Sequence, residues 1–260
     1  MDQELRVFRF LGYRSLVCVL LLFAAATPAL LAAERAIVSN TPPPPYILVG
    51  FVGGFVRHDD AHHSPVKVSR RLQQDSPKDT YIEVFENRHR KTALKTILHL
   101  LDANHDGVLS EDEKAAAHIM LFGHSWGASA VVLLARELNR IGVPVMLTVQ
   151  VDSVAKPWQN DAVIPENVAA AVNFYQPHGI IHGRSQIKAA DDFKTRILGN
   201  YLFDYKEGPV RCEGYSWFDR TITRDHMQSE CDPRIWSQVE NLVRERMTPE
   251  RPNLAANPAP

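Results

Sequence analysis

Short, almost uninterrupted apolar runs are the feature that most constrains the fold of this chain. They are YILVGFV at 46–52, HIMLFG at 118–123 and VPVMLTVQV at 143–151, and AAVNFYQ at 170–176 is a further candidate. Runs of this length without polar alternation are typical of parallel strands buried on both faces. Stretches with helical spacing separate them. The pattern therefore predicts an α/β fold with a mainly parallel sheet and helices on both faces.

The helical stretches are supported by their end signals. One opens with Ser-Pro, and the longest ends at Gly142. We expect helices at 64–74, 89–101, 126–142 and 232–247, and a further strand at 80–86. No internal repeat is present. These elements suit one domain over 46–247, preceded by a Pro-rich lead-in at 34–45 and followed by a disordered tail at 248–260.

The N-terminal 33 residues have the pattern of a secretory signal peptide. Arg6, Arg9 and Arg14 precede an uncharged apolar run at 15–33, after which charges return. A retained membrane anchor is the alternative, because the run is long enough to cross a bilayer. Pro28 and the alanine-rich end favour cleavage. We expect a periplasmic or secreted mature chain without a membrane span.

The cysteine content agrees with export. Cys212 and Cys231 remain after cleavage, and an oxidising compartment favours a disulfide between them over two buried thiols. The whole chain has 260 residues, 45% of them hydrophobic, and a net charge of −1. It is long enough for a sizeable core and lacks the basic excess of a nucleic-acid-binding protein.

The stretch LFGHSWGASA at 121–130 contains a Gly-x-Ser-x-Gly motif between an apolar strand and a long helix. Glycines on both sides of a serine permit a tight strand-to-helix turn, which exposes the hydroxyl at the carboxyl edge of the sheet. The turn also directs the helix N-terminus at developing negative charge. Ser125 is therefore the predicted nucleophile. The alternative is a glycine-bounded turn without chemistry.

A serine nucleophile needs a base and an orienting acid, which follow it in the chain in this kind of fold. Asp152 comes at the end of the next strand and is the predicted acid, with Asp161 as the alternative. The strand after that ends in Gln176, so no acid occurs at the other common location. His226, placed in a loop before the last helix, is the predicted base. Two other histidines could line the pocket or be solvated, His178 and His182.

An oxyanion hole requires two backbone N–H donors. The first predicted donor is Trp126, directly after the serine. The second comes from the GGFV stretch after the first strand, with Phe55 preferred and Gly54 possible. The alternative for this glycine pair is a simple turn.

The segment DANHDGVLSEDE at 102–113 fits the spacing of a calcium-binding loop. The predicted ligands are Asp102, Asn104, Asp106, the carbonyl of Val108, Ser110 and Glu113. No second loop of this kind is found, so we expect one structural Ca²⁺, and no organic cofactor. The alternative is an acidic linker without metal. RHDDAHH at 57–63 lacks regular ligand spacing and is interpreted as a polar loop beside the site.

Together, GHSWG, the GGF after the first strand, the acid after the next strand and the late histidine resemble the α/β-hydrolase superfamily. The position of the acid resembles that in pancreatic-type lipases, although no obvious long lid is present. The wider pattern from LFGHSWG to VNFYQ is similar to a group of exported bacterial hydrolases with no settled substrate. The loop at 102–113 resembles a single EF-hand-type calcium loop inserted before the nucleophile strand. The resemblance implies a Ser125–Asp152–His226 triad but no particular substrate.

Two functions follow from these features. The first is an exported serine esterase, lipase-like in its chemistry, that acts on a small-molecule or lipid-like ester through an acyl-enzyme. Amide or thioester cleavage by the same triad is not separable from it by sequence. The second is a non-catalytic calcium-binding protein on a hydrolase scaffold. The two differ in whether Ser125, Asp152 and His226 meet in space.

Overall fold

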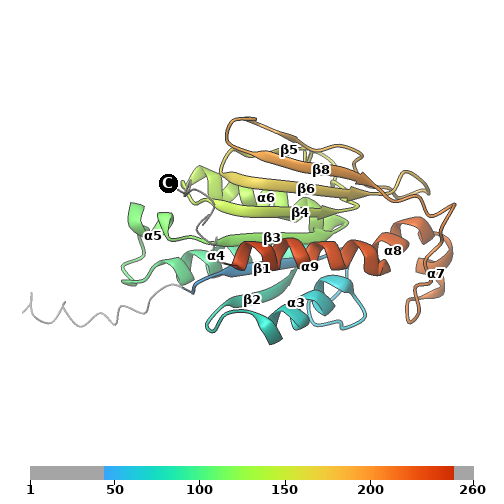
Figure 1. Cartoon of the computed structure of the whole chain (residues 1–260), viewed down its shortest axis with the longest axis horizontal. Helices are drawn as coiled ribbons and strands as arrows, with labels where there is room; N and C mark the ends of the chain where they lie inside the picture. Colours follow the sequence, from blue (N-terminus) through green and yellow to red (C-terminus); the bar gives the residue numbers. More distant parts are fainter. Residues whose placement is uncertain (1–43, 249–260) are drawn as a thin grey trace, which may run out of the picture. The chain divides into compact units, whose positions relative to one another are not determined.

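Six parallel strands form the centre of this computed structural model, which describes residues 44–248. They lie in the order β2-β1-β3-β4-β6-β8 (Figure 1). Their bounds are β1 (Ile47–Val52), β2 (Tyr81–Glu86), β3 (Ile119–His124), β4 (Val145–Val151), β6 (Val168–Tyr175) and β8 (Arg196–Leu202). A small two-stranded sheet pairs β5 (Val163–Ile164) with β7 (Lys188–Ala189). Every one of these strand pairs is parallel.

Helices cover both faces of the large sheet. Their bounds are α3 (Ser64–Asp75), η1 (Asn87–His89), α4 (Arg90–Leu101), α5 (Glu111–Ala115), α6 (Trp126–Arg140), α7 (Trp217–Thr221), α8 (Arg224–Cys231) and α9 (Pro233–Met247). The predicted fold class, α/β with a mainly parallel sheet and helices on both faces, is confirmed. The predicted signal peptide, all but two residues of the lead-in, and all but one residue of the tail lie outside the described residues.

The apolar runs of the sequence form two core layers. Along β1, Ile47, Val49 and Phe51 pack with α4 and α6, whereas Leu48 packs on the other face with α3 and α9. Each of these side chains is fully buried. Successive side chains of a strand point to opposite faces, so a strand covered on both sides must be apolar at nearly every position. This explains why the central strands were predictable from their composition.

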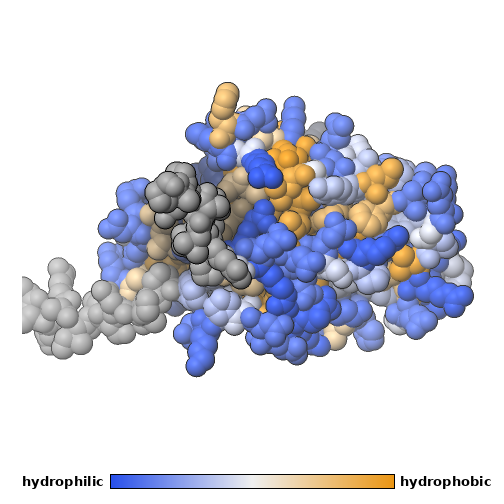
Figure 2. Space-filling view, in the orientation of Figure 1, coloured by the Kyte–Doolittle hydropathy of each residue, from blue (hydrophilic) through white to orange (hydrophobic). Residues whose placement is uncertain are grey.

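The elements that the sequence analysis did not identify lie at the margin of this core. β8 is the edge strand, and its sequence RILGNYL is half exposed rather than apolar throughout. Figure 2 shows hydrophobic residues at the surface beside α9. On β8, Tyr201 and Leu202 are exposed. α7 and α8 are short and polar. In residues 44–248, no helix combines the length and apolarity needed to cross a membrane.

Two glycines allow β3, α6 and β1 to approach one another closely. A Cβ on Gly123 would lie 2.6 Å from the carbonyl carbon of Gly127, and a Cβ on Gly127 would lie 2.4 Å from the carbonyl oxygen of Phe51. Both contacts are with backbone atoms, which cannot rotate away. The two glycines of the Gly-x-Ser-x-Gly motif are therefore required for packing at the start of α6.

This packing predicts that Gly127→Ala lowers the free energy of unfolding by about 1–3 kcal/mol, because the added methyl group overpacks the contact with Phe51. Urea denaturation measures the change. Gly208→Ala is the matched control, since a Cβ there meets no atom within 4 Å, and we expect a change within about 0.5 kcal/mol. Equal losses in the two variants would contradict this account.

Candidate active site

Ser125 forms the turn between β3 and α6 by itself. Its backbone has φ 57° and ψ −126°, a conformation that residues other than glycine rarely adopt. Its N–H donates to the carbonyl of Val151 on β4 at 3.0 Å, and its side chain is almost buried. Strain of this kind costs about 1–3 kcal/mol and persists where the surrounding structure enforces it. The nucleophile elbow of the α/β-hydrolase fold places its serine on a strained strand-to-helix turn of this kind.

The structure brings Ser125, His226 and Asp152 together in one chain of hydrogen bonds. The Oγ of Ser125 lies 2.9 Å from Nε2 of His226, and Nδ1 of His226 lies 2.7 Å from Oδ2 of Asp152. All three side chains are buried. The Nδ1–H of His226 donates to the carboxylate, so Nε2 is free to accept the proton of the hydroxyl. The catalytic role of the three residues stays a prediction, which this geometry supports.

Asp152 follows β4 directly and is fully buried, with φ 43°. Its Oδ1 accepts a hydrogen bond from the N–H of Gly183 at 2.6 Å, and its Oδ2 accepts one from Nε2 of Gln176 at 2.9 Å. These donors satisfy the carboxylate and fix the oxygen that faces His226. Gln176 was predicted only as the end of a strand without an acid. Its position directly after β6, the strand that pairs with β4, is the signal that would have identified it.

The alternative acid and bases lie elsewhere. Asp161 is fully buried and forms an ion pair with Arg184. His178 pairs with Asp204, with 3.2 Å between Nε2 and Oδ2. His182 is exposed, and its Nδ1 lies 3.4 Å from a loop carbonyl. In residues 44–248, none of them has a hydrogen bond to Ser125 or His226.

His226 lies in helix α8 and not in a loop, so that part of the sequence prediction is wrong. The helix was missed because its sequence, RDHMQSEC, is too short and polar to show an apolar period. The helical position buries the ring against the sheet edge. Burial lowers the pKa of His226 from its usual range, although the hydrogen bond to Asp152 acts in the opposite direction.

Two of the residues predicted to supply oxyanion donors are in side-chain contact. Trp126 is the first residue of α6, so its N–H has no partner within the helix. The rings of Phe55 and Trp126 meet edge to face, with 5.6 Å between their centroids. The Gly54 carbonyl accepts a hydrogen bond from Nδ2 of Asn87 at 2.6 Å, which fastens the loop after β1 to the end of β2.

A lysine also lies at this side of the site. Nζ of Lys156 donates to Oδ1 of Asn87 at 2.8 Å and lies 4.8 Å from the ring centroid of Trp126. It therefore links the loop after β4 to Asn87 after β2, and through Asn87 to the loop after β1. Neither Lys156 nor Asn87 belongs to a motif, so their roles were not predictable from the sequence.

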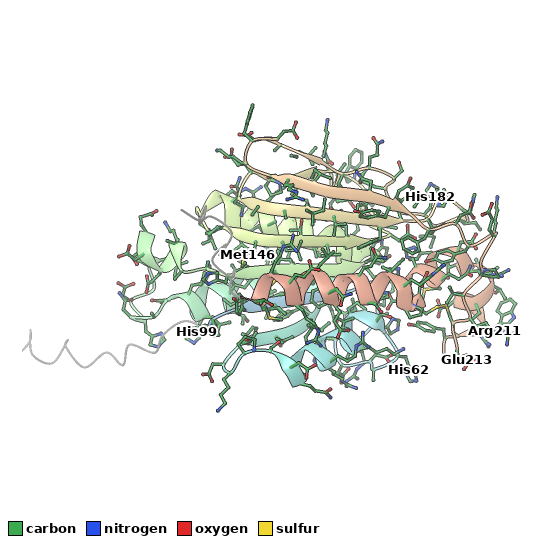
Figure 3. The ribbon with its side chains drawn as sticks, in the orientation of Figure 1. His62, His99, Met146, His182, Arg211 and Glu213 are labelled. Carbon is green, nitrogen blue, oxygen red and sulfur yellow. A yellow bond between two sulfur atoms is a disulfide. The ribbon has the colours of Figure 1, made fainter. Side chains whose placement is uncertain are left out.

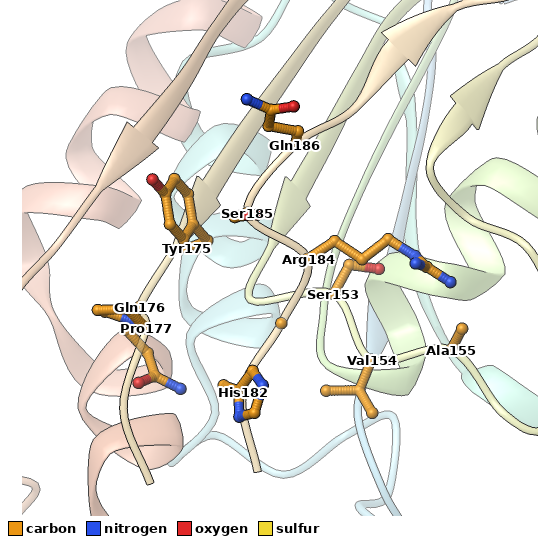
Figure 4. A pocket seen from close by; sticks show the side chains of 11 residues that line it. Ser153, Val154, Ala155, Tyr175, Gln176, Pro177, His182, Arg184, Ser185 and Gln186 are labelled. Atoms are coloured by element: carbon orange, nitrogen blue, oxygen red, sulfur yellow. The ribbon is translucent and has the colours of Figure 1, made fainter.

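A pocket of about 570 Å³ lies between the loop after β4 and the loop after β6 (Figure 4). Ser153 directly follows Asp152, and the N–H of Val154 donates to the Ser125 carbonyl at 3.3 Å. His182 and Arg184 come from the loop after β6.

The loop at 102–113 lies at the opposite end of the sheet, where α5 is found, whereas α8 lies at the end that carries the triad (Figure 1). Figure 3 shows the same separation, with His99 of α4 near the loop and His182 far from it. The Asp102 carboxylate accepts hydrogen bonds from the N–H groups of Asp106 and Gly107. The side chain of Glu113 closes the loop.

Glu113 accepts hydrogen bonds from the N–H groups of Ala103 and Ser110, each at 2.8 Å. These bonds hold the pKa of its carboxyl below the usual range, Ser110 contributing most. Within residues 44–248, no group of three or more His, Cys, Asp or Glu side chains is arranged to hold a metal ion. Calcium binding by this loop stays a prediction.

The predicted disulfide is confirmed. Cys212 and Cys231 are bonded, with their Cα atoms 5.6 Å apart. Cys231 is the last residue of α8, the helix that carries His226. The bond therefore ties the end of this helix to the loop before α7.

No family model and no curated protein matches the chain. Similar solved structures include a cutinase-like protein from a Cryptococcus species, with 10% identity and a TM-score of 0.39 over 80% of this chain and 98% of that one. An acetyl xylan esterase has 10% identity and a TM-score of 0.37 over 80% and 100%. A dienelactone hydrolase from Anabaena variabilis has 14% identity and a TM-score of 0.35 over 77% and 84%. Likeness at this level carries no argument about activity.

The disulfide predicts a measurable contribution to stability. Replacing both Cys212 and Cys231 by alanine should lower the free energy of unfolding by about 3 kcal/mol, because the bond closes a loop with a sequence separation of 19 residues. Denaturant unfolding measures the loss. Reductant should then destabilise the wild type and leave the double variant unchanged. A reductant effect of equal size in both would contradict the assignment.

Proposed function

We propose that this protein is a serine hydrolase that cleaves esters through an acyl-enzyme. The observation that carries the proposal is the buried hydrogen-bond chain from Ser125 through His226 to Asp152. A non-catalytic scaffold would have no need to maintain the strained backbone of Ser125 against such a chain. The two functions suggested by the sequence differ on this contact, and its presence favours the enzyme.

In the first half-reaction, Oγ of Ser125 attacks the ester carbonyl carbon while Nε2 of His226 takes the hydroxyl proton. Asp152 holds the imidazole in position and stabilises the imidazolium that forms. The tetrahedral intermediate carries negative charge on the former carbonyl oxygen. It collapses when His226 gives its proton to the leaving alkoxide, which departs as an alcohol.

In the second half-reaction, water attacks the acyl carbon and gives a proton to His226. Collapse of the second tetrahedral intermediate releases the acid and returns the proton to Ser125. The N–H of Trp126 at the start of α6 and that of Phe55 or Gly54 are the proposed oxyanion donors in both steps. The positive end of the α6 dipole supports the same charge.

Export is the second part of the proposal. The signal-peptide pattern at 1–33 and the bond between Cys212 and Cys231 both support a periplasmic or secreted protein, because such bonds persist in oxidising compartments.

A structural calcium ion at 102–113 is the third part. The oxygen-rich donor set suits a hard cation, and Gly107 has the left-handed φ of 82° that the sharp bend of such a loop requires. The hydrogen bonds of Glu113 to the loop N–H groups would be exchanged for the cation. At the far end of the sheet, an ion would act on stability and not on the chemistry.

The nucleophile is tested with a short-chain chromogenic ester. Ser125→Ala should lower kcat/KM by about 10⁴-fold or more, because it removes the attacking oxygen. Ser129→Ala is the matched control: this buried serine lies one turn further along α6, and its hydroxyl has no partner among the described residues. It should keep most of the activity. Full turnover by Ser125→Ala would refute the proposed mechanism, and parallel assays with thioester and amide substrates define the bond that is cleaved.

The calcium loop is tested by thermal unfolding. Calcium at ten times its dissociation constant should stabilise the mature chain by about 1.4 kcal/mol, seen as a higher Tm. Glu113→Gln should remove most of this gain. Glu111→Gln should retain it, because Glu111 is exposed and pairs only with Lys114 among the described residues. Identical Tm values in calcium and in chelator would exclude a folded calcium site.

A further inference from the structure

A second group of buried charged side chains lies behind His226, and the proposed mechanism does not use it. Nδ1 of His124 lies 2.5 Å from Oε2 of Glu230. Oε1 of Glu230 lies 3.0 Å from Nδ1 of His63 and accepts the N–H of Ser64 at 3.1 Å. His124 and Glu230 are 4% and 1% exposed. Burying such groups costs several kcal/mol unless they are paired, so the arrangement requires an explanation.

The contacts of His124 assign its charge. Oγ of Ser229 donates its one proton to the His226 carbonyl at 2.7 Å. At 3.3 Å from Nε2 of His124, it can therefore only accept from that nitrogen. The other nitrogen, Nδ1, lies 2.5 Å from Oε2 of Glu230, so one proton lies between the two atoms. The ring holds this proton, because the N–H of Ser64 donates to the other oxygen of Glu230 and stabilises the carboxylate form. Both ring nitrogens of His124 are donors, so its ring is an imidazolium.

This cation lies against the predicted base. The rings of His124 and His226 are stacked, with 4.6 Å between centroids and 29° between planes. Burial opposes the charge of His124, but Glu230 outweighs it and raises the pKa of His124. The same pair holds the pKa of Glu230 low in spite of burial. The charge of His124 acts with burial to lower the pKa of His226.

The other ionisable groups around the two rings are few. Asp152 at the end of β4 bonds His226. Beyond Glu230, Nε2 of His63 lies 3.9 Å from Oδ2 of Asp60, and the ring of Tyr215 packs edge-on against the ring of His63. The ring of His226 thus lies between two charges: the carboxylate of Asp152 at Nδ1, and the imidazolium of His124 against its face. Glu230 balances the imidazolium on the side away from His226.

We propose that Glu230 holds His124 as an imidazolium behind His226, and that this buried cation keeps His226 neutral, and able to accept the Ser125 proton, in mildly acidic medium. His124 and Glu230 are positioning residues, because they act through His226 and do not touch the reacting atoms. The proposal rests on the proposed function only in taking His226 as the base. The charge states themselves are independent of any activity.

The direct test is nuclear magnetic resonance of the imidazole nitrogens in the wild-type chain. At pH 7, His124 should show the shifts of a doubly protonated ring, and His226 those of a neutral ring protonated at Nδ1. A neutral His124 at this pH would overturn the proposal, whether or not the protein hydrolyses any ester. Glu230→Gln should convert His124 to the neutral form at the same pH.

The functional test is the acidic limb of the kcat/KM profile, compared with the titration of His226 by resonance. His124→Asn removes the cation and leaves the carboxylate of Glu230. The acidic limb and the titration of His226 should therefore both move to higher pH by about one unit. The double variant His124→Asn/Glu230→Gln removes both charges and should lie between the wild type and the single variant. His118→Asn, at the other end of β3, is the matched control and should not move either.

The outcomes separate the two proposals. If His226 titrates at higher pH in His124→Asn but no ester is cleaved by any variant, the electrostatic proposal stands and the hydrolase proposal fails. If all variants are active with one common acidic limb, His124 and Glu230 are structural only and the further inference is wrong. Titration of His226 at lower pH in His124→Asn would also overturn the further inference. Removing a neighbouring cation should make protonation of His226 easier, and the titration should therefore move to higher pH.

Discussion

The passage of β3 into α6 through a single residue is the constraint on which the rest of the site depends. Ser125 makes this turn only because three backbones pack in direct contact: Gly123 against Gly127, and Gly127 against the carbonyl of Phe51. The same contact fixes the start of α6 next to the loop after β1. The same contact between the glycines and β1 therefore positions the proposed nucleophile, the start of α6 and the proposed oxyanion donors. A small change there would displace all of them together.

Helix α8 completes the site from outside the sheet. His226, Ser229 and Glu230 lie at spacings of three and four residues, which put them on one face of the helix. Each bonds a different part of the structure: Asp152, the ring of His124, and the loop before α3. The helix is polar and has little apolar surface of its own. It is held mainly by these polar contacts and by the bond from Cys231 to Cys212.

Sequence reasoning was sufficient where one physical requirement dominates. Strands buried on both faces need apolar residues throughout. The central strands, and the helices that alternate with them along the chain, were therefore predictable. The turn at Ser125 and the acid after β4 followed from the topology of a parallel sheet, in which the carboxyl ends of all strands meet at one edge. Sequence reasoning failed for α8 and β8. The residues of these elements make polar contacts and edge contacts, which leave no apolar period in the sequence. His124 stood inside the quoted motif, but its role depends on Glu230, over a hundred positions away.

The sheet holds two of the three triad residues, and a segment outside the sheet leads to the third. This separation has an evolutionary consequence. Ser125 and Asp152 are fixed by adjacent strands, β3 and β4, whereas the chain between β8 and α8 lies outside the sheet. Length changes in that connection leave the strand register intact, and surface loops tolerate insertion at small entropic cost. The segment can therefore change in length and sequence while Ser125 and Asp152 stay in place.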